Sequence, residues 1–232
     1  MPSVPAGDRT GSAKESFNPY PRPSVAVDTA LLTVVPGDDF LSVLLVFRNP
    51  GEYAADNAGG EWVLPGAILR KGERLIDAIR RSLRVKAGID GMNPRQLHVF
   101  DDPERDSRGW VLSVAHLDVV PSSRLEPRDD SRARLVPVDA PGDHLPFEHG
   151  KIIEYAVAEV RAQYERSPDP YTLLDEPFTI LDLRRLHEAV AGKPLQRDTF
   201  RRLMTAQLAS TGQWSDGTRG RPAELFRRRL RD

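Results

Sequence analysis

The alternation of apolar and polar positions predicts a hairpin near the start of the chain. Two β-branched or apolar runs, Val25–Val35 and Leu41–Val46, are separated by the turn sequence Pro36-Gly37-Asp38-Asp39. Further strands are predicted at three later apolar runs, Trp62–Leu64, Leu97–Phe100 and Trp110–Val120.

Helical spacing of apolar residues appears twice in the same part of the chain. One helix is predicted over Glu73–Lys86 and is ended by Gly88, and a longer one runs over Glu148–Arg166. The Pro-rich stretch Val136–Pro146 is expected to be a connector between them. This mixture of strands and helices predicts an α+β fold.

The last third of the chain has a different pattern. After the break Ser167-Pro168-Asp169-Pro170, Thr179 and Asp182 have the spacing of a capping box at the start of a helix that Gly192 ends. A second helix is predicted over Gln196–Ser210, with a Gly-rich hairpin behind it. Helix, short turn, helix and basic hairpin is the order of elements in a winged helix-turn-helix.

Composition adds to this division. Residues 1–18 are polar and rich in Pro, Gly and Ser, and we expect a disordered tail there. We predict one domain over residues 19–166, with 148–166 as its linker helix, and a second domain over residues 167–232. The absence of cysteine and of any long apolar run is compatible with a cytoplasmic protein without a membrane segment or thiolate metal site.

Charge is unevenly distributed although the net charge is only −1. Residues 193–232 hold ten Lys or Arg against four Asp or Glu, whereas the rest of the chain holds 23 against 30. A basic end on an acidic body predicts an anionic partner for that end, and a solvated charged tail is the alternative.

The second C-terminal helix predicts how DNA would be read. Phe200, Leu203, Met204 and Leu208 share its apolar face, and its polar residues can meet base edges in the major groove. A solvated basic face on a dimerisation domain is the alternative. The candidate DNA-binding residues are Arg197, Thr199, Arg201, Arg202 and Thr205 in the helix, and Arg219, Arg221 and Arg227 in the wing, where Arg228 is also suited to phosphate contacts.

The segment Leu64–Glu73 resembles the loop that enters the helix of a Nudix domain. Aligned on Glu73, Ala67 takes the place of the first glycine of the Nudix box and Arg81 falls on its arginine. The resemblance implies a Nudix-like α/β/α sandwich with a mixed sheet. Three positions that should be metal-binding glutamates hold Ser82, Val85 and Lys86, so metal-dependent hydrolysis of a diphosphate is not expected.

Both halves together resemble the Nudix-related transcriptional regulators of NAD metabolism, the NrtR family. This resemblance implies a homodimer that binds palindromic operators of NAD biosynthesis or salvage genes as a repressor. It also implies ADP-ribose or a related NAD product as the ligand that releases DNA. The supporting segments are Arg22–Asp28, Arg105–Gly109, Phe147–Ile153, Leu173-Leu174, Phe178-Thr179, Phe200–Arg202 and Gly220–Ala223.

A diphosphate held without a metal or other cofactor needs positive charge beside it. We expect one or more cations near the Nudix-like helix to contact it, and Trp62 to stack on the adenine. An ordinary solvated charged face is the alternative. The candidate effector-binding residues are Arg48, Trp62, Arg70, Lys71, Arg81, Lys86 and Arg108.

Two other functions remain open at this point. The first is an ADP-ribose pyrophosphatase with an altered metal site and an accessory DNA-binding tail, against which the missing glutamates argue. The second is a pseudoenzyme scaffold that binds only protein, which gives no reason for a basic wing. Product release from ADP-ribose in Mg²⁺ or Mn²⁺, measured beside operator binding, separates the enzyme from the regulator.

Overall fold

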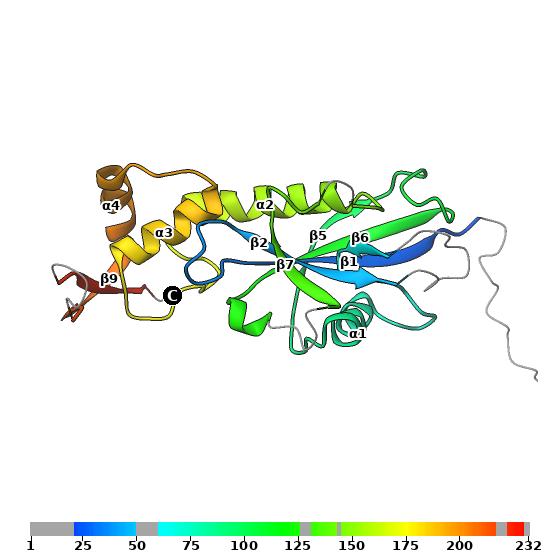
Figure 1. Cartoon of the computed structure of the whole chain (residues 1–232), viewed down its shortest axis with the longest axis horizontal. Coiled ribbons are helices and arrows are strands. Elements are labelled where there is room, and N and C mark those ends of the chain that lie inside the picture. The colour runs from blue at the N-terminus through cyan, green and yellow to red at the C-terminus, as the bar shows by residue number, and fades with distance from the viewer. Residues whose placement is uncertain (1–20, 50–59, 126–130, 143–144, 217–221, 230–232) are drawn as a thin grey trace, which may run out of the picture.

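The computed structural model describes residues 21–49, 60–125, 131–142, 145–216 and 222–229, and it confirms the α+β fold class. A mixed sheet with a helix on each face is followed by a smaller unit of two helices and three short strands (Figure 1). Residues 1–18, for which a disordered tail was predicted, lie outside the described part of the chain. The sheet strands are β1 (Ser24–Thr33), β2 (Ser42–Arg48), β3 (Glu61–Val63), β4 (Gly66–Ile68), β5 (Arg95–Phe100), β6 (Val111–Val119) and β7 (Ala133–Pro137).

Strand β1 is the centre of this sheet. It pairs in parallel with β6 and antiparallel with β2 and β4, so the sheet is mixed. The predicted hairpin is confirmed, with Leu32 opposite Val43. Eight consecutive residues from Ala26 to Thr33 are buried, because the sheet is covered on both faces and a near-continuous apolar strand is needed.

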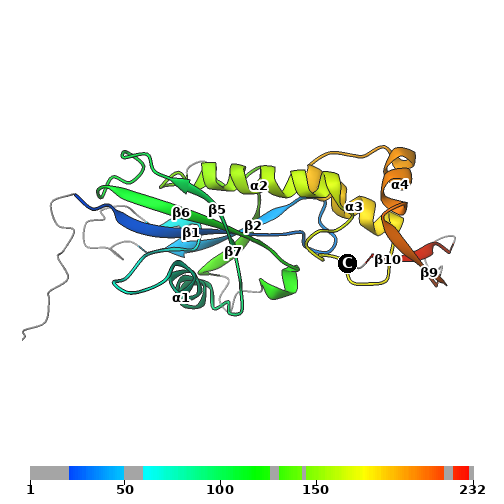
Figure 2. The ribbon, with the colours of Figure 1, turned by 180° about the vertical axis from the view of Figure 1, so that it is seen from behind.

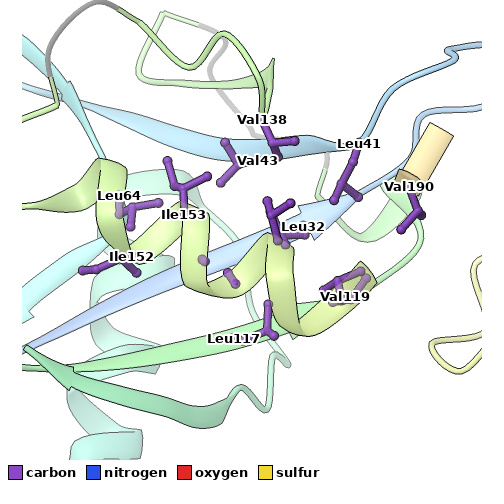
Figure 3. Packing of buried hydrophobic residues seen from close by; sticks show 14 of the residues in the cluster. Leu32, Leu41, Val43, Leu64, Leu117, Val119, Val138, Ile152, Ile153 and Val190 are labelled. Carbon is purple, nitrogen blue, oxygen red and sulfur yellow. The ribbon is translucent and has the colours of Figure 1, made fainter. Parts of the chain in front are cut away.

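Helices α1 (Leu75–Ala87) and α2 (His149–Arg166) cover opposite faces of the sheet. Both were predicted, to within two residues at each end, and Gly88 ends α1 in the left-handed conformation that favours glycine. On the α2 side, Ile152 and Ile153 pack against Leu32, Val43 and neighbouring sheet residues (Figure 3). Ile79 and Leu83 of α1 belong to a second cluster with Val27 and Leu31.

The connector predicted over Val136–Pro146 is wrong at its beginning. Strand β7 occupies Ala133–Pro137 and pairs with β2, with Val43 opposite Val136. The prolines suggested a loop, but β7 pairs only with β2 among the described strands, and an edge strand tolerates a proline because its outer N–H groups need no partner. A short 3₁₀ helix, Ser122–Arg124, precedes β7.

The C-terminal unit has the predicted order of a winged helix-turn-helix (Figure 2). Its capping box is confirmed, since Thr179 Oγ1 accepts the Asp182 N–H at 3.1 Å and Asp182 accepts the Thr179 N–H at 3.0 Å. The three strands pair in the order β8-β10-β9. The elements are β8 (Phe178–Thr179), α3 (Ile180–Ala191), α4 (Arg197–Thr205), β9 (Leu208–Trp214) and β10 (Glu224–Arg228).

Helix α4 ends earlier than predicted. It stops at Thr205 instead of Ser210, because Leu208–Trp214 pairs with β10 as a strand. Phe200 and Met204 face the core of this unit as expected, together with Leu208. Leu203 was expected on the same face, but it is 55% exposed and lines a groove beside α2 and α3.

The end of α2 is tied to the C-terminal unit by buried polar contacts. Arg161 Nε donates to the Val190 carbonyl of α3 at 2.9 Å, and Tyr164 Oη donates to Asp169 at 3.0 Å. Asp169 also accepts the amides of Leu173 and Leu174 at 3.0 Å. The Pro-containing segment after α2 is therefore fixed in place. Within the described residues, no helix has the length and apolar composition needed to cross a membrane.

Candidate functional site

A small pocket opens between β1, the β3–β4 turn, α1 and the start of α2. Its cavity measures about 50 Å³. Three of the predicted effector-binding residues line it: Arg48, Lys86 and Arg108. Its other charged or aromatic lining residues are Asp28, Arg105, Asp106, Phe147 and His149.

A buried hydrogen-bonded pair, Asp28 and His149, forms the floor of this pocket. The Leu64 N–H donates to His149 Nδ1 at 3.0 Å, so Nε2 carries the ring proton and faces Asp28 Oδ1 at 3.3 Å. Ser113 Oγ donates to the other Asp28 oxygen at 2.5 Å. Burial alone would raise the pKa of Asp28, but His149, Ser113 and Arg105 together hold it below its usual value.

Arg105 brings a buried positive charge to the same place. Its side chain is 1% exposed and lies 3.6 Å from both Asp28 Oδ2 and Glu148 Oε2. Its Nη2 donates to the Phe147 carbonyl at 2.7 Å, whereas its Nε makes no hydrogen bond to any described residue. The sequence placed this residue in a family segment but did not predict it as a site residue.

Two guanidinium groups lie against the Phe147 ring. The Arg48 and Arg108 Cζ atoms are 4.9 and 4.5 Å from its centroid, within range of a cation–π contact. Arg48 pairs with Glu61 at 2.7 Å, and Arg108 makes two hydrogen bonds to Asp106 at 2.7 and 2.8 Å. Burial would raise the pKa of Asp106, but the hydrogen bonds from Arg108 lower it. The pocket thus holds a cluster of cations oriented by carboxylates.

The residues on α1 do not fit a divalent cation. Buried Ser82 donates its hydroxyl to the Gly66 carbonyl at 2.9 Å, Val85 is 65% exposed, and Lys86 brings positive charge to the pocket. The nearby carboxylates of Glu73 and Asp106 are paired with arginines. Among the described residues no three His, Asp or Glu side chains are grouped as metal ligands.

Four predicted effector-binding residues lie outside the lining of the pocket. Arg81 instead forms two 2.8 Å hydrogen bonds with Glu73 and holds the loop before α1; these bonds lower the pKa of Glu73 to about 2. Arg70 and Lys71 are exposed on that loop. Trp62 packs against Phe47 at a centroid distance of 5.3 Å, with the Arg134 guanidinium over its ring at 4.0 Å.

A second concave surface lies on the C-terminal unit, between α3, α4 and the wing. Its cavity of about 620 Å³ is lined by the predicted Arg197 and Arg201, and also by Arg184 and Trp214, which the sequence analysis missed. Trp214 is 63% exposed. Such a groove presents arginines at the surface, and arginine is suited to contacts with the phosphates and base edges of DNA.

The other predicted DNA-binding residues have different surroundings. Thr199, Arg202 and Arg227 are exposed, but they do not line this groove. The Thr205 hydroxyl is buried without a hydrogen-bond partner among the described residues, so its predicted outward orientation is wrong. Arg219 and Arg221 lie outside the described part of the chain.

Arg228 was suited to phosphate contacts by sequence, but its guanidinium is turned inward. It pairs with Asp169 and Glu176, each at 2.7 Å, and also donates to the Leu174 carbonyl. It therefore joins β10 to the segment after α2.

Comparison with known proteins relates both halves of the chain to one family. Residues 170–228 match the NrtR DNA-binding winged helix domain. A solved structure of NrtR from Shewanella oneidensis complexed with a 27mer DNA is 30% identical, with a TM-score of 0.70, and the match covers 88% of this chain and 93% of that one. The chain belongs to the NrtR family.

Two further relatives extend this assignment. The ADPR responsive transcriptional repressor NtrR of Acinetobacter baylyi is 28% identical over 220 residues, which are 92% of this chain and 85% of that protein. The NUDIX domain of Shewanella oneidensis NrtR, solved with ADP ribose, is 26% identical with a TM-score of 0.52. That match covers 62% of this chain and 94% of the domain. The N-terminal unit of this NrtR family member therefore has a Nudix-like fold.

The pocket residues missed by sequence reasoning lie in segments that resembled the NrtR family. Asp28 ends the first such segment, Arg105 and Asp106 begin the second, and Phe147 and His149 belong to the third. The signal was present, but only the folded chain brings these three segments together.

Proposed function

We propose that this chain is a DNA-binding transcriptional repressor that ADP-ribose, bound in the N-terminal pocket, releases from its operator. One observation carries the proposal: a single chain joins an NrtR winged helix, with arginines in a groove, to a Nudix-like pocket lined by cations. The names of two relatives support it, since one is an ADPR responsive repressor and another was solved with DNA.

On the DNA side, α4 is the recognition helix. Arg197 and Arg201 lie in the groove with Arg184, and arginine can pair with guanine through two hydrogen bonds in the major groove. Arg202 and Thr199 of α4 and Arg227 of the wing are exposed and suited to phosphate or base contacts. We also assign phosphate contacts to Arg219 and Arg221 of the wing, as the sequence predicts.

On the effector side, the pocket offers four cations to a diphosphate. Lys86, Arg48 and Arg108 were predicted for this role, and we add the buried Arg105, which lines the same pocket. Charge-assisted hydrogen bonds from such groups are stronger than neutral ones, so they can take the place of a metal ion. We do not assign effector binding to the predicted residues outside the pocket lining, which are Trp62, Arg70, Lys71 and Arg81.

The proposal treats ADP-ribose as a ligand and not as a substrate. Ser82, Val85 and Lys86 give a divalent ion no carboxylate where Nudix hydrolases hold it, so no attacking water is activated. In Mg²⁺ or Mn²⁺ we expect hydrolysis near background. A turnover on the order of 1 s⁻¹ or more, as in ordinary enzymes, would support the hydrolase alternative.

Three finer features belong to the same proposal. The domains meet near residues 166 and 167, a homodimer binds a palindromic operator through two copies of α4, and the target genes serve NAD biosynthesis or salvage. Dimeric helix-turn-helix proteins read half-sites one helical turn apart, so the spacing in a bound duplex tests the dimer. We place the activity in the cytoplasm, as expected of a DNA-binding regulator of this family.

Duplexes selected by the full chain from a random library provide the test. The selected duplex is titrated in a mobility-shift assay with ADP-ribose, NAD and nicotinamide mononucleotide in parallel. We expect the protein–DNA complex to dissociate with ADP-ribose. Selection of no duplex, or a complex unchanged by all three ligands, would contradict the proposal.

A further inference from the structure

Two adjacent residues before α2 have a strained backbone. Phe147 and Glu148 have φ values of 59° and 58°, in the left-handed region that side chains other than glycine, Asn and Asp rarely adopt. Such conformations persist where surrounding contacts hold them, and they are concentrated at binding and switching sites. Here the holding contacts are the Arg105 hydrogen bond to the Phe147 carbonyl and the ion pairs of Glu148 with Arg105 and Lys151.

The ring that this backbone presents contacts two members of the cation cluster. Phe147 lies against the guanidinium groups of Arg48 and Arg108 and is 5.7 Å from the His149 ring. The remaining cavity of about 50 Å³ is far below the ~300–1,000 Å³ typical of small-molecule sites. A diphosphate with its nucleoside therefore needs an outward movement of the pocket lining, and Phe147 covers the groups that would bind the anion.

We propose that Phe147 is an autoinhibitory plug: ADP-ribose displaces its ring from Arg48 and Arg108, and this displacement resets the first turn of α2. The inference rests on the proposed function, because it uses ADP-ribose as the ligand. An anion that recruits Arg105 removes the hydrogen bond that holds the Phe147 carbonyl, and the strained pair of residues is then released.

Contacts along α2 carry the change toward the DNA-binding unit. Glu148 is the residue before α2, and its carbonyl accepts the Ile152 amide at 3.1 Å. At the other end, Arg161 donates to the Val190 carbonyl of α3, and Tyr164 donates to Asp169, which also binds Arg228 of the wing. A ligand that binds only the conformation with Phe147 displaced increases the population of that conformation, and the contacts at both ends of α2 change with it.

The test compares the full chain with its Phe147→Ala variant by calorimetry with ADP-ribose in EDTA. A minor open state is typically populated at ~0.1–10%, so removing the plug should lower the Kd for ADP-ribose by about tenfold or more. The same variant should respond less to ligand: ADP-ribose should change its affinity for the selected duplex by a factor near one. Tyr155→Ala, an exposed aromatic on α2 outside the pocket, is the control and should behave as the unmodified chain.

A second measurement uses the unmodified chain and does not depend on the folding of a variant. ADP-ribose should speed hydrogen exchange of the Ile152 amide, because the first turn of α2 is released. Weaker ADP-ribose binding by Phe147→Ala would show that the ring contacts the ligand, and unchanged exchange at Ile152 would show that α2 does not respond; either result overturns the plug. If the unmodified chain binds no ADP-ribose at all, the proposed function itself fails.

Discussion

Lys71 and Lys86 lie in the same region of the chain but have different surroundings. Both were predicted to contact the effector, but Lys86 lines the pocket and Lys71 is exposed on the loop before α1. We predict that Lys86→Ala weakens ADP-ribose binding by about tenfold or more, since a hydrogen bond to a charged group contributes about 1.5–3 kcal/mol. Lys71→Ala is the matched control and should bind ADP-ribose as before. Calorimetry in EDTA measures both, and equal affinities for the two variants would refute the assignment of Lys86.

On the C-terminal unit, Arg201 is the residue whose proposed DNA contact can be tested in the same way. It lies in the groove of α4, so Arg201→Ala should lose about 1–3 kcal/mol of binding to the selected duplex and should discriminate less among related sequences. Arg80 is exposed on α1, far along the chain from the groove. Arg80→Ala removes one positive charge there and serves as the control for net charge. Anisotropy titrations of a labelled duplex measure the difference. A loss of the same size in both variants would mean that Arg201 contributes only its charge.

At the scale of elements, two neighbouring arginines of β10 have different surroundings. Arg228 pairs with fully buried Asp169, whereas Arg227 is exposed on the same strand. Arg228→Ala should lower the free energy of unfolding by about 3 kcal/mol, because it leaves the buried Asp169 carboxylate with hydrogen bonds but without its positively charged partner. Arg227→Ala should change stability by less than about 0.5 kcal/mol, as surface substitutions usually do, and weaken DNA binding. Denaturant unfolding decides this: equal stability of the two variants contradicts the structural role of Arg228.

Histidine 187 gives the junction between α2, α3 and α4 a pH dependence. Its ring lies 4.9 Å from both the Tyr164 and Phe200 rings, and burial lowers its pKa. The unfolded state therefore binds a proton more readily, so stability is lost as pH falls below the unfolded value of about 6.5. We predict a lower unfolding temperature at pH 5 than at pH 7, and a smaller difference in His187→Gln. The same difference in both proteins would exclude this histidine as a cause.

The elements were largely predictable, and the exceptions have physical causes. Periodicity located both α1 and α2, Gly88 marked the end of α1, and the Thr179–Asp182 capping box located α3. Pairing between strands overrode local pattern twice: β7 extends into the first residues of the Pro-rich stretch, and β9 takes residues from the predicted end of α4. Pairing with a distant strand leaves little trace in a local window of sequence.

The N-terminal pocket was predictable only in part, because three separate segments build it. A charge on the predicted Nudix-like helix pointed to Lys86, but the same reasoning included Arg81, which Glu73 holds away from the pocket lining. Arg105 and His149 both contact Asp28 only because β1, the loop before β6 and α2 meet. Sequence therefore identified Lys86, Arg48 and Arg108 among the lining residues, but not the buried group around Asp28.

At the scale of the whole molecule, α2 spans the distance between the two sites. Its first residue, His149, lines the pocket to which we assign the effector, and its last turns contact α3 and Asp169 (Figure 1). If this helix couples the sites, ADP-ribose and DNA must weaken each other's binding by the same factor, since such coupling is reciprocal. A coupling of about 5–150-fold is the usual range.

The most direct test measures ADP-ribose affinity by calorimetry for the free protein and for the protein saturated with its selected duplex, both in EDTA. The account predicts that ADP-ribose binds the free protein without a divalent ion. It also predicts a Kd that rises in the DNA complex by the factor with which ADP-ribose weakens DNA binding. Equal ADP-ribose affinity with and without DNA, or binding that appears only when Mg²⁺ is added, would contradict a repressor released by the bound, intact ligand.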